Sequence, residues 1–209
     1  IEAGARRFVH ASTAKVSGET TEPGRPFRID DTPQPQDDYA RSKWRAEQSL
    51  QRIAGGSPMS VSVLRLPLVY GPGVRGNFRT LWEAVAQRQW LPFAAIENRR
   101  SMIGLPNVVD AFAAAADAPP GTYFVADEEN ISTPQLVRSI AEAQRVEISL
   151  ARVPVALLRV VGVVTGRSAA IHRLTSSLEV DAGPFREASG WMPQRTLAQT
   201  LAVMARGES

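Results

Sequence analysis

The chain has 209 residues, of which 44% are hydrophobic and 22% charged, a balance typical of a globular protein with a substantial core. Its formal net charge of +3 comes from scattered arginines, without a basic run interleaved with aromatic residues, so nucleic-acid binding has little support. With no cysteine and only two histidines, the chain offers no disulfide or cysteine nucleophile, and we expect no metal site.

No segment has the pattern of a signal peptide or of a transmembrane helix. The most apolar run, from Val153 to Val164, is interrupted by Pro154 and Arg159 and is too short to span a bilayer. We therefore expect a cytoplasmic protein. We expect the run itself to form a buried amphipathic helix, and an interfacial or partner-binding helix is the alternative.

The first part of the chain predicts a strand, a helix and a second strand. Arg7 to Ala11 is a short apolar strand, followed by small hydroxyl residues and a proline-dotted loop. A helix from Tyr39 to about Ala54 follows, and Met59 to Leu66 is the apolar run of a buried strand. This order is a βαβ unit and implies a parallel sheet. The core face of the helix is expected to comprise Ala46, Leu50, Ile53 and Ala54.

The rest of the chain continues the alternation of apolar runs and helical periodicity. Pro106 and Pro134 each stand where a helix accepts proline, in its first turn. The predicted helices are Asn77 to about Gln89, Pro106 to about Asp117, Thr133 to about Gln144, Val155 to about Val164 and Thr196 to about Met204. The predicted strands are Leu91 to Ile96, Arg100 to Leu105, Gly121 to Ala126, Ile148 to Val153 and Glu179 to Asp181.

Tyr39 and Lys43 form the most informative pair in the sequence. They are four residues apart at the start of a predicted helix, so both project from one face. Lys15 and Lys43 are the only lysines of a chain that otherwise uses arginine, and lysine is the compact point charge. An ammonium beside a phenol favours the phenolate, so the pair predicts acid–base chemistry. The bland alternative is a surface helix with an accidental spacing.

Three separated segments together resemble the extended short-chain dehydrogenase/reductases, the family of NAD-dependent nucleotide-sugar epimerases and dehydratases. Phe8 to Gly18 looks like the family's strand with hydroxyl residues, Tyr39 to Lys43 like its Y-x-x-x-K helix, and Leu64 to Gly73 like its R-x-x-x-V-Y-G-P segment. Weaker matches are Arg100 to Ile103 and Ser189 to Pro193, similar to R-D-x-I and L-G-W-x-P. The resemblance covers nearly the whole chain, and the common order of the motifs makes it specific.

The resemblance implies a mechanism and its residues. Tyr39 would be the base, Lys43 would promote its ionisation, and Thr13, with Ser12, would bind the reacting oxygen. The cofactor would be NAD or NADP. The residues expected to bind it are Ala11, Tyr39, Lys43, Pro67 and Val69.

The substrate implied is a UDP-sugar. Arg100 is the first candidate for its diphosphate, because a guanidinium matches phosphate oxygens, and Arg75 and Arg173 are further candidates. Asn77 matches a position that contacts the substrate phosphate in the family, although it is equally suited to cap a helix. The resemblance also implies a homodimer through the Tyr39 helix.

In fold, the resemblance implies an α/β protein: an incomplete Rossmann-like parallel sheet with helices, plus a small C-terminal α/β substrate-binding cap. Residues 1–70 and 103–126 would form the remainder of the NAD-binding Rossmann domain, and residues 71–102 and 127–209 the cap. The Gly-rich G-x-x-G-x-x-G turn of the family is absent from this sequence. We therefore expect an N-terminally truncated chain that lacks on the order of 100 residues, about 30 for each missing βαβ unit.

Departures from the family pattern narrow the expected activity. Ala14 and Lys15 stand where the dehydratases carry an Asp-Glu pair, which disfavours 4,6-dehydration. Ser17 and Leu68 replace a tyrosine and an asparagine common in galactose 4-epimerases. We expect a 4-epimerase or 4-keto-reductase for a UDP-hexose or UDP-N-acetylhexosamine in bacterial surface polysaccharide synthesis. The alternatives are an inert fragment that at most binds UDP-sugar, and a steroid- or flavonoid-type ketoreductase.

Overall fold

A three-stranded parallel sheet forms one half of the molecule in the computed structural model, which describes residues 4–87 and 90–207. Its strands are β1 (Arg7–Thr13), β2 (Ser60–Leu66) and β5 (Thr122–Phe124), in the order β1-β2-β5. β1 and β2 pair along their whole length, so Ser12 lies opposite Arg65. The predicted α/β fold with a parallel sheet is confirmed.

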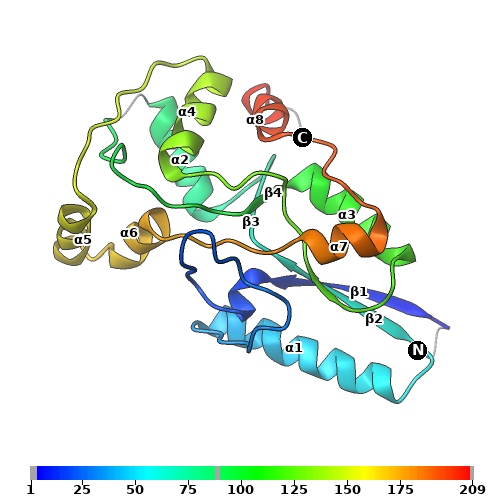
Figure 1. Ribbon diagram of the computed structural model, residues 1–209. Coiled ribbons are helices and arrows are strands. Elements are labelled where there is room, and N and C mark those ends of the chain that lie inside the picture. The colour runs from blue at the N-terminus through cyan, green and yellow to red at the C-terminus, as the bar shows by residue number, and fades with distance from the viewer. Residues whose placement is uncertain (1–3, 88–89, 208–209) are drawn as a thin grey trace.

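Helices cover both faces of this sheet (Figure 1). On one face lies α1 (Asp38–Gly55), and on the other lie α3 (Leu105–Asp117) and α7 (Gly183–Ser189). Between the sheet and α3 and α7 is a core of buried residues: Leu64, Ile103, Ala111, Ala115, Val125, Phe185 and Trp191. Gly190 ends α7 in the left-handed conformation with φ of 67°, which turns the chain so that Trp191 enters this core.

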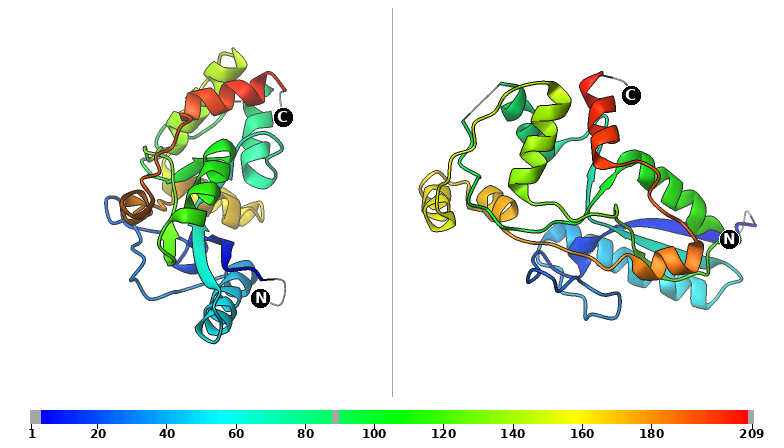
Figure 2. Two further views of the ribbon diagram at one scale, coloured as in Figure 1. Left: turned by 90° about the vertical axis from the view of Figure 1, so that its right-hand side faces the viewer. Right: turned by 45° about the horizontal axis from the view of Figure 1, so that its top comes forward.

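A second, larger core lies beyond the carboxyl ends of the strands. A short parallel pair, β3 (Leu68–Tyr70) and β4 (Met102–Gly104), leads into it from the main sheet. Three helices surround this core: α2 (Gly76–Ala86), α4 (Thr133–Gln144) and α8 (Leu197–Ala205). Figure 2 shows them gathered at one end of the molecule, away from α1. The helix α2 buries Phe78, Leu81 and Val85 in this core.

The remaining helices lie at the edges. A 3-10 turn, η1 (Ala14–Val16), follows β1, while α5 (Val155–Val164) and α6 (Ser168–Thr175) form a hairpin at one corner (Figure 1). The helix predicted over 155–164 is present, but the expectation that it is buried is wrong. Only Leu158 and Gly162 of α5 are buried, because the helix packs mainly against α6 and reaches the second core with Leu158, while most of its other side chains stay exposed.

Several predicted strands are not strands in the structure. Residues 91–96, 148–153 and 179–181 form only isolated bridges, Leu91 with Leu150 and Val180 with Phe27. These runs are apolar because they line the cores, and burial alone does not distinguish a strand from an irregular segment. Conversely, β3, α6 and α7 were not predicted. The helix expected over 77–89 ends at 86, and its last two positions lie outside the described residues.

The core face of α1 differs from the predicted one. The helix buries Ala40 and Glu47, whereas Ile53 is half exposed. A charged residue occupies the centre of the buried face because Arg65 on β2 stands opposite and pairs with it. No helix among residues 4–87 and 90–207 is long and apolar enough to cross a bilayer. The division into a Rossmann part and a cap stays a prediction.

Candidate active site

The ammonium of Lys43 is fixed at the carboxyl end of β1. Its Nζ donates a hydrogen bond of 2.9 Å to the carbonyl oxygen of Ala11 and lies 5.9 Å from the centre of the Tyr39 ring. The Tyr39 side chain is 54% exposed, so its hydroxyl is accessible to a ligand. The spacing of four residues thus brings a phenol and an ammonium together beside the end of a parallel strand, where ligands bind in open α/β sheets.

Thr13 and Ser12 point to opposite faces of β1, as successive residues of a strand must. Thr13 ends the strand and caps η1, where its Oγ1 accepts a 3.3 Å hydrogen bond from the backbone N–H of Lys15. Ser12 instead donates its hydroxyl hydrogen to Glu47 in the interior. Of the two predicted hydroxyl residues, Ser12 therefore belongs to a buried network, and Thr13 is the one at the end of the strand.

That buried network is centred on an ion pair between Glu47 and Arg65. The carboxylate of Glu47 is fully buried and accepts from Arg65 Nη2 at 2.7 Å and from Nε at 3.2 and 3.3 Å. Arg65 Nη1 donates to Ser17 Oγ at 3.2 Å, and the guanidinium lies between the rings of Trp44 and Phe124. Bidentate geometry and a complete set of partners are what a buried charge pair requires. It holds α1 on the sheet.

His10 lies on the same face of β1 as Ser12. Its Nε2 is buried and has no hydrogen-bond partner among the described residues. Burial lowers the pKa of His10, the nearby ammonium of Lys43 lowers it further, and Glu47 opposes this. The imidazole is therefore neutral, and it lies between the Lys43 ammonium and the Glu47 carboxylate of α1.

The start of α1 is tied to the loop after β1. Asp37 caps the helix by accepting from the backbone N–H of Ala40 at 2.7 Å, and it pairs with Lys15 Nζ at 2.6 Å. The hydrogen bond from Lys15 lowers the pKa of Asp37. Lys15 also pairs with Glu19 at 2.8 Å. The other lysine of the chain is thus used to position the helix that carries Tyr39.

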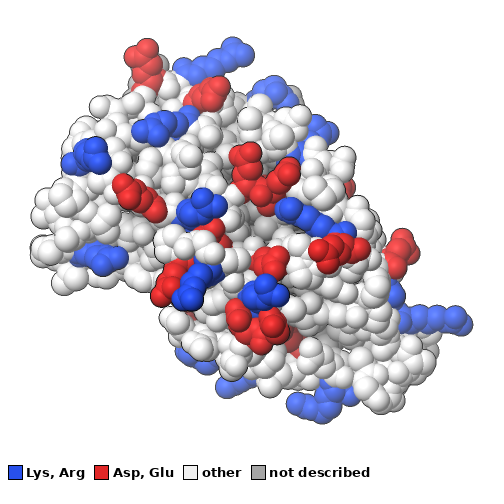
Figure 3. Space-filling model, viewed as in Figure 1, with Lys and Arg blue, Asp and Glu red and all other residues white. Residues whose placement is uncertain are grey.

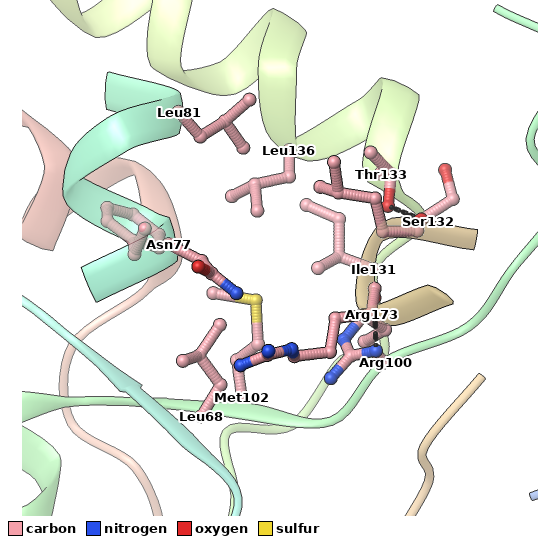
Figure 4. A pocket seen from close by; sticks show the side chains of 12 residues that line it. Leu68, Asn77, Leu81, Arg100, Met102, Ile131, Ser132, Thr133, Leu136 and Arg173 are labelled. Carbon is pink, nitrogen blue, oxygen red and sulfur yellow. Dashed lines mark hydrogen bonds between the residues drawn. The ribbon is translucent and has the colours of Figure 1, made fainter. Parts of the chain in front are cut away.

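A small pocket of about 90 Å³ lies beside β3 and brings together three of the four predicted substrate residues (Figure 4). Asn77 reaches it from α2, Arg100 from the segment before β4 and Arg173 from α6. Its walls are mostly apolar, and among the apolar residues only Leu68 was singled out from the sequence, as the replacement of an asparagine. They include Leu68, Leu81, Met102, Ile131 and Leu136, together with Ser132 and Thr133 at the start of α4. A further sequence signal for this wall was the predicted beginning of a helix at Thr133.

Arg100 is the best-fixed cation of the pocket. Its Nη1 donates to the carbonyl oxygens of Arg173 at 2.7 Å and Ser176 at 3.1 Å. Burial lowers the pKa of Arg100, and the charge of Arg173 lowers it further. Two like charges held in one pocket favour the binding of an anion, which relieves both the desolvation and the repulsion.

Asn98 fixes this pocket from beneath. Its side-chain amide donates to Thr133 Oγ1 and to the carbonyl oxygens of Leu174 and Ser176, each at 3.1 Å. Its Oδ1 accepts from the backbone N–H of Thr133 at 2.8 Å. The amide therefore joins the first residue of α4 to the end of α6, so that both hold the pocket wall in place.

The other predicted residues lie elsewhere. Arg75 precedes α2 and lines a separate surface hollow, so the structure does not bring it together with Asn77 and Arg100. On β3, Val69 packs against the core beneath α3. Pro67 stands between β2 and β3 and is partly buried. Among the described residues, no group of acidic or histidine side chains could hold a metal ion.

A partly buried carboxylate joins the main sheet to the second core. Asp127 accepts from the Tyr70 hydroxyl at 2.6 Å, from Asn107 Nδ2 at 2.7 Å and from the backbone N–H of Gly104 at 3.1 Å. Burial raises the pKa of Asp127, although these donors oppose the rise. Burial likewise raises the pKa of Tyr70. The tyrosine of the V-Y-G-P segment therefore has a structural partner.

Comparisons with known proteins agree on one family. A family model described as the NAD dependent epimerase/dehydratase family matches residues 1–126. A UDP-glucose 4-epimerase of Vibrio cholerae is 37% identical over 203 residues, which is 95% of this chain and 62% of that protein. An N-acetyl-alpha-D-glucosaminyl-diphospho-ditrans,octacis-undecaprenol 4-epimerase of Escherichia coli O157:H7 is 23% identical and covers 78% of this chain and 54% of that protein.

Solved structures of similar fold include a UDP-glucose 4-epimerase of Thermotoga maritima, crystallised with UDP-glucose. It superposes on 99% of this chain with a TM-score of 0.77 at 20% identity, and the match covers 64% of that protein. The chain thus spans less than two thirds of the length of the relatives it matches.

Proposed function

Because the chain belongs to the NAD dependent epimerase/dehydratase family, we propose that it supplies the catalytic and substrate-binding residues of a nucleotide-sugar 4-epimerase or 4-keto-reductase. The proposed substrate is a UDP-hexose or UDP-N-acetylhexosamine used for surface polysaccharide. The observation that carries the proposal is the placement of the Lys43 ammonium between the Ala11 carbonyl and the Tyr39 ring. The similarity to a UDP-glucose 4-epimerase supports the choice of substrate class.

The residues present fit the nicotinamide-ribose end of NAD or NADP. Tyr39 is exposed, and Lys43 uses one of its three N–H donors on Ala11, which leaves others for a ribose hydroxyl. The sequence has no G-x-x-G-x-x-G turn for the pyrophosphate. When bound, NAD(P) would accept a hydride from the sugar carbon and return it.

In this proposal, Tyr39 takes the proton of the sugar's C4 hydroxyl group as the C–O bond gains double-bond character, and later gives it back. The fixed ammonium of Lys43 lies beside the Tyr39 ring, where its positive charge would balance the negative charge that develops on the phenol oxygen during proton transfer. Thr13, at the end of β1, would donate a hydrogen bond to the same oxygen and hold it toward Tyr39. Such positioned acid–base groups typically contribute about 10²- to 10⁴-fold to the rate.

The pocket beside β3 would hold the substrate's diphosphate. Arg100 has further N–H donors beyond the one fixed to Arg173 and Ser176, and Arg173 adds a second guanidinium. Asn77, at the first turn of α2, would contact a phosphate oxygen. The pocket is too small for a whole nucleotide sugar, so we expect the uridine and the sugar to extend from it in opposite directions.

The test is conversion of UDP-glucose or UDP-N-acetylglucosamine in the presence of NAD, followed by proton NMR of the C4 epimer. We expect the wild-type protein to form the epimer, Tyr39→Phe to bind UDP-sugar without turnover, and Arg100→Ala to lose binding. Wild-type turnover by Tyr39→Phe would contradict the role of the phenol. Binding of UDP-sugar with no turnover by the wild type would favour the inert alternative, and NADPH-dependent reduction of a steroid or flavonoid ketone would favour the ketoreductase.

A further inference from the structure

The hairpin of α5 and α6 presents an apolar surface that has no cover. α5 packs on α6 at Gly162, where a Cβ would approach the Ile171 side chain to 3.0 Å, and its Leu158 joins the second core. This close packing orients the rest of α5 outward at one corner of the molecule, as the views of Figure 2 show.

Five large apolar side chains make up this surface, which we call the α5 face. Val163 is 71% and Val164 81% exposed, and the other three are about half exposed. The members of the α5 face are Leu157, Val160, Val161, Val163 and Val164. A contiguous apolar patch on one short helix is unusual for a water-exposed surface and marks an interaction site. Figure 3 shows the surface over α5 as mainly uncharged.

The charges in the segment that carries the α5 face are all of one sign, and the two carboxylates that line a hollow beside α6, Glu19 and Asp37, pair with Lys15. Residues 148–178 contain no aspartate or glutamate, and the arginines in this stretch are Arg152, Arg159, Arg167 and Arg173. None of them forms an ion pair within the described part of the chain, whereas arginines elsewhere pair with carboxylates, as Arg79 does with Glu83. The α5 face is thus flanked by uncompensated positive charge.

We propose that the α5 face docks on the surface of a bilayer that contains anionic lipids. Short apolar side chains on a helix lying in the plane of the interface reach the boundary between headgroups and acyl chains. Arginines at its border reach lipid phosphates, and the attraction increases with each basic residue near the surface. An apolar face with a cationic border and no acidic residue matches this chemistry.

A second copy of the chain fits the α5 face less well. In a two-fold contact the same surface meets itself, so Arg159 and Arg167 would approach their own copies. Without carboxylates in the segment, nothing in it would neutralise that repulsion. Lipid phosphates supply the missing negative charge.

The docking would place one wall of the candidate substrate pocket near the bilayer. Arg173 lies on α6, which packs directly against α5, and it also lines the pocket with Arg100. Binding of the α5 face to a bilayer does not require turnover of a substrate.

Flotation with lipid vesicles tests the inference. We expect the full 209-residue chain to bind vesicles of phosphatidylcholine with phosphatidylglycerol, to bind vesicles of phosphatidylcholine alone much more weakly, and to dissociate as salt is added. The triple variant Val160→Ser, Val163→Ser and Val164→Ser should bind at least about tenfold more weakly. The double variant Arg159→Gln and Arg167→Gln should also lose about tenfold.

Matched controls exist in the chain. Val109 on α3 is 62% exposed and Arg52 on α1 is exposed, so Val109→Ser and Arg52→Gln should bind vesicles like the wild type. Circular dichroism and thermal unfolding check that the variants fold. We expect them to fold because the substituted positions are exposed. Vesicle binding that the α5 variants leave unchanged, or the absence of any vesicle binding, would overturn the inference. A dimer that the valine variants break, without vesicle binding, would assign the α5 face to a second copy instead.

Discussion

Two halves of α1 use the same stripe of residues for opposite purposes. Tyr39, Lys43 and Glu47 follow one another at intervals of four and lie on one side of the helix. Tyr39 is 54% exposed, Lys43 is intermediate and Glu47 is fully buried. The stripe therefore passes from solvent to core within two helical turns.

The difference between the halves lies in how their charges are satisfied. Glu47 in the buried half has Arg65 and Ser12 as partners, so that its charge has no remaining need for a ligand. Lys43 in the exposed half is fixed by a single carbonyl, and Tyr39 faces solvent. The network of Glu47, in which every charge has a partner, fixes the helix. Tyr39 and Lys43, which keep free hydrogen-bonding groups, remain available to bind a ligand and to react. The proposed chemistry at Tyr39 thus depends on Glu47, because the Glu47–Arg65 pair fixes the helix that carries Tyr39.

Replacing Lys43 breaks the exposed half and should have the largest effect. Lys43→Met removes the cation beside the Tyr39 phenol, so we expect turnover to fall by about 10²- to 10⁴-fold, while the protein stays folded. Arg45→Met is the matched control, because Arg45 is an exposed cation on the same helix and lies outside the proposed chemistry. Steady-state rates of the two variants should differ by at least about tenfold, and equal rates would contradict the role of Lys43.

Replacing Glu47 breaks the buried half. Glu47→Ala leaves the Arg65 guanidinium buried without its carboxylate, which should lower the free energy of unfolding by about 3–5 kcal/mol. Urea unfolding followed by circular dichroism measures this. Glu83→Ala removes the carboxylate of an exposed pair with Arg79 and should unfold like the wild type. A loss for Glu47→Ala that is no larger than for Glu83→Ala would mean that the pair does not hold α1.

The exposed half of this comparison could be predicted from the sequence, and the buried half could not. The spacing of Tyr39 and Lys43 is local, so helical geometry alone places them side by side. The pairing of Glu47 with Arg65 depends on the register of β1 and β2 and on the packing of α1, which no local pattern contains. The apolar periodicity therefore predicted that Ile53 is buried and gave no indication that Glu47 is.

The same reasoning applies to the rest of the fold. Helices with proline in their first turn, such as α3 and α4, were predicted closely because their signals lie within a few residues. Residues 91–96 were predicted as a strand, but their backbone bonds depend on partners far along the chain. The pocket with Asn77, Arg100 and Arg173 is built by three separate segments, and only the resemblance to a family pointed to these residues.

The two hydroxyls at the end of β1 test the comparison further. Ser12 contacts Glu47 in the buried half of α1, and Thr13 is assigned to the proposed site at Tyr39 in the exposed half. Ser12→Ala removes a donor to buried Glu47 and should lower the free energy of unfolding by about 1–2 kcal/mol with the rate unchanged. Thr13→Ala removes the proposed contact to the reacting oxygen, so the rate should fall about tenfold or more, and because it also removes the cap of η1, the free energy of unfolding should fall by about 1 kcal/mol. Rates and urea midpoints of both variants measure this, and an equal loss of rate in both would contradict the separation.

The smallest effect is expected at His10, which lies where the two halves meet. Its pKa is lowered from 6.5 by burial and by Lys43, with Glu47 opposing, so the unfolded chain binds a proton there more readily than the folded one. The stability contributed by neutral His10 is therefore complete above pH 6.5 and is lost as the pH falls from 6.5 towards the folded-state pKa. His10→Phe should flatten this part of the curve of unfolding free energy against pH, which urea unfolding at a series of pH values measures. An unchanged slope in His10→Phe would show that the His10 imidazole titrates alike in the folded and unfolded states. Burial and the charges of Lys43 and Glu47 would then have no net effect on its pKa.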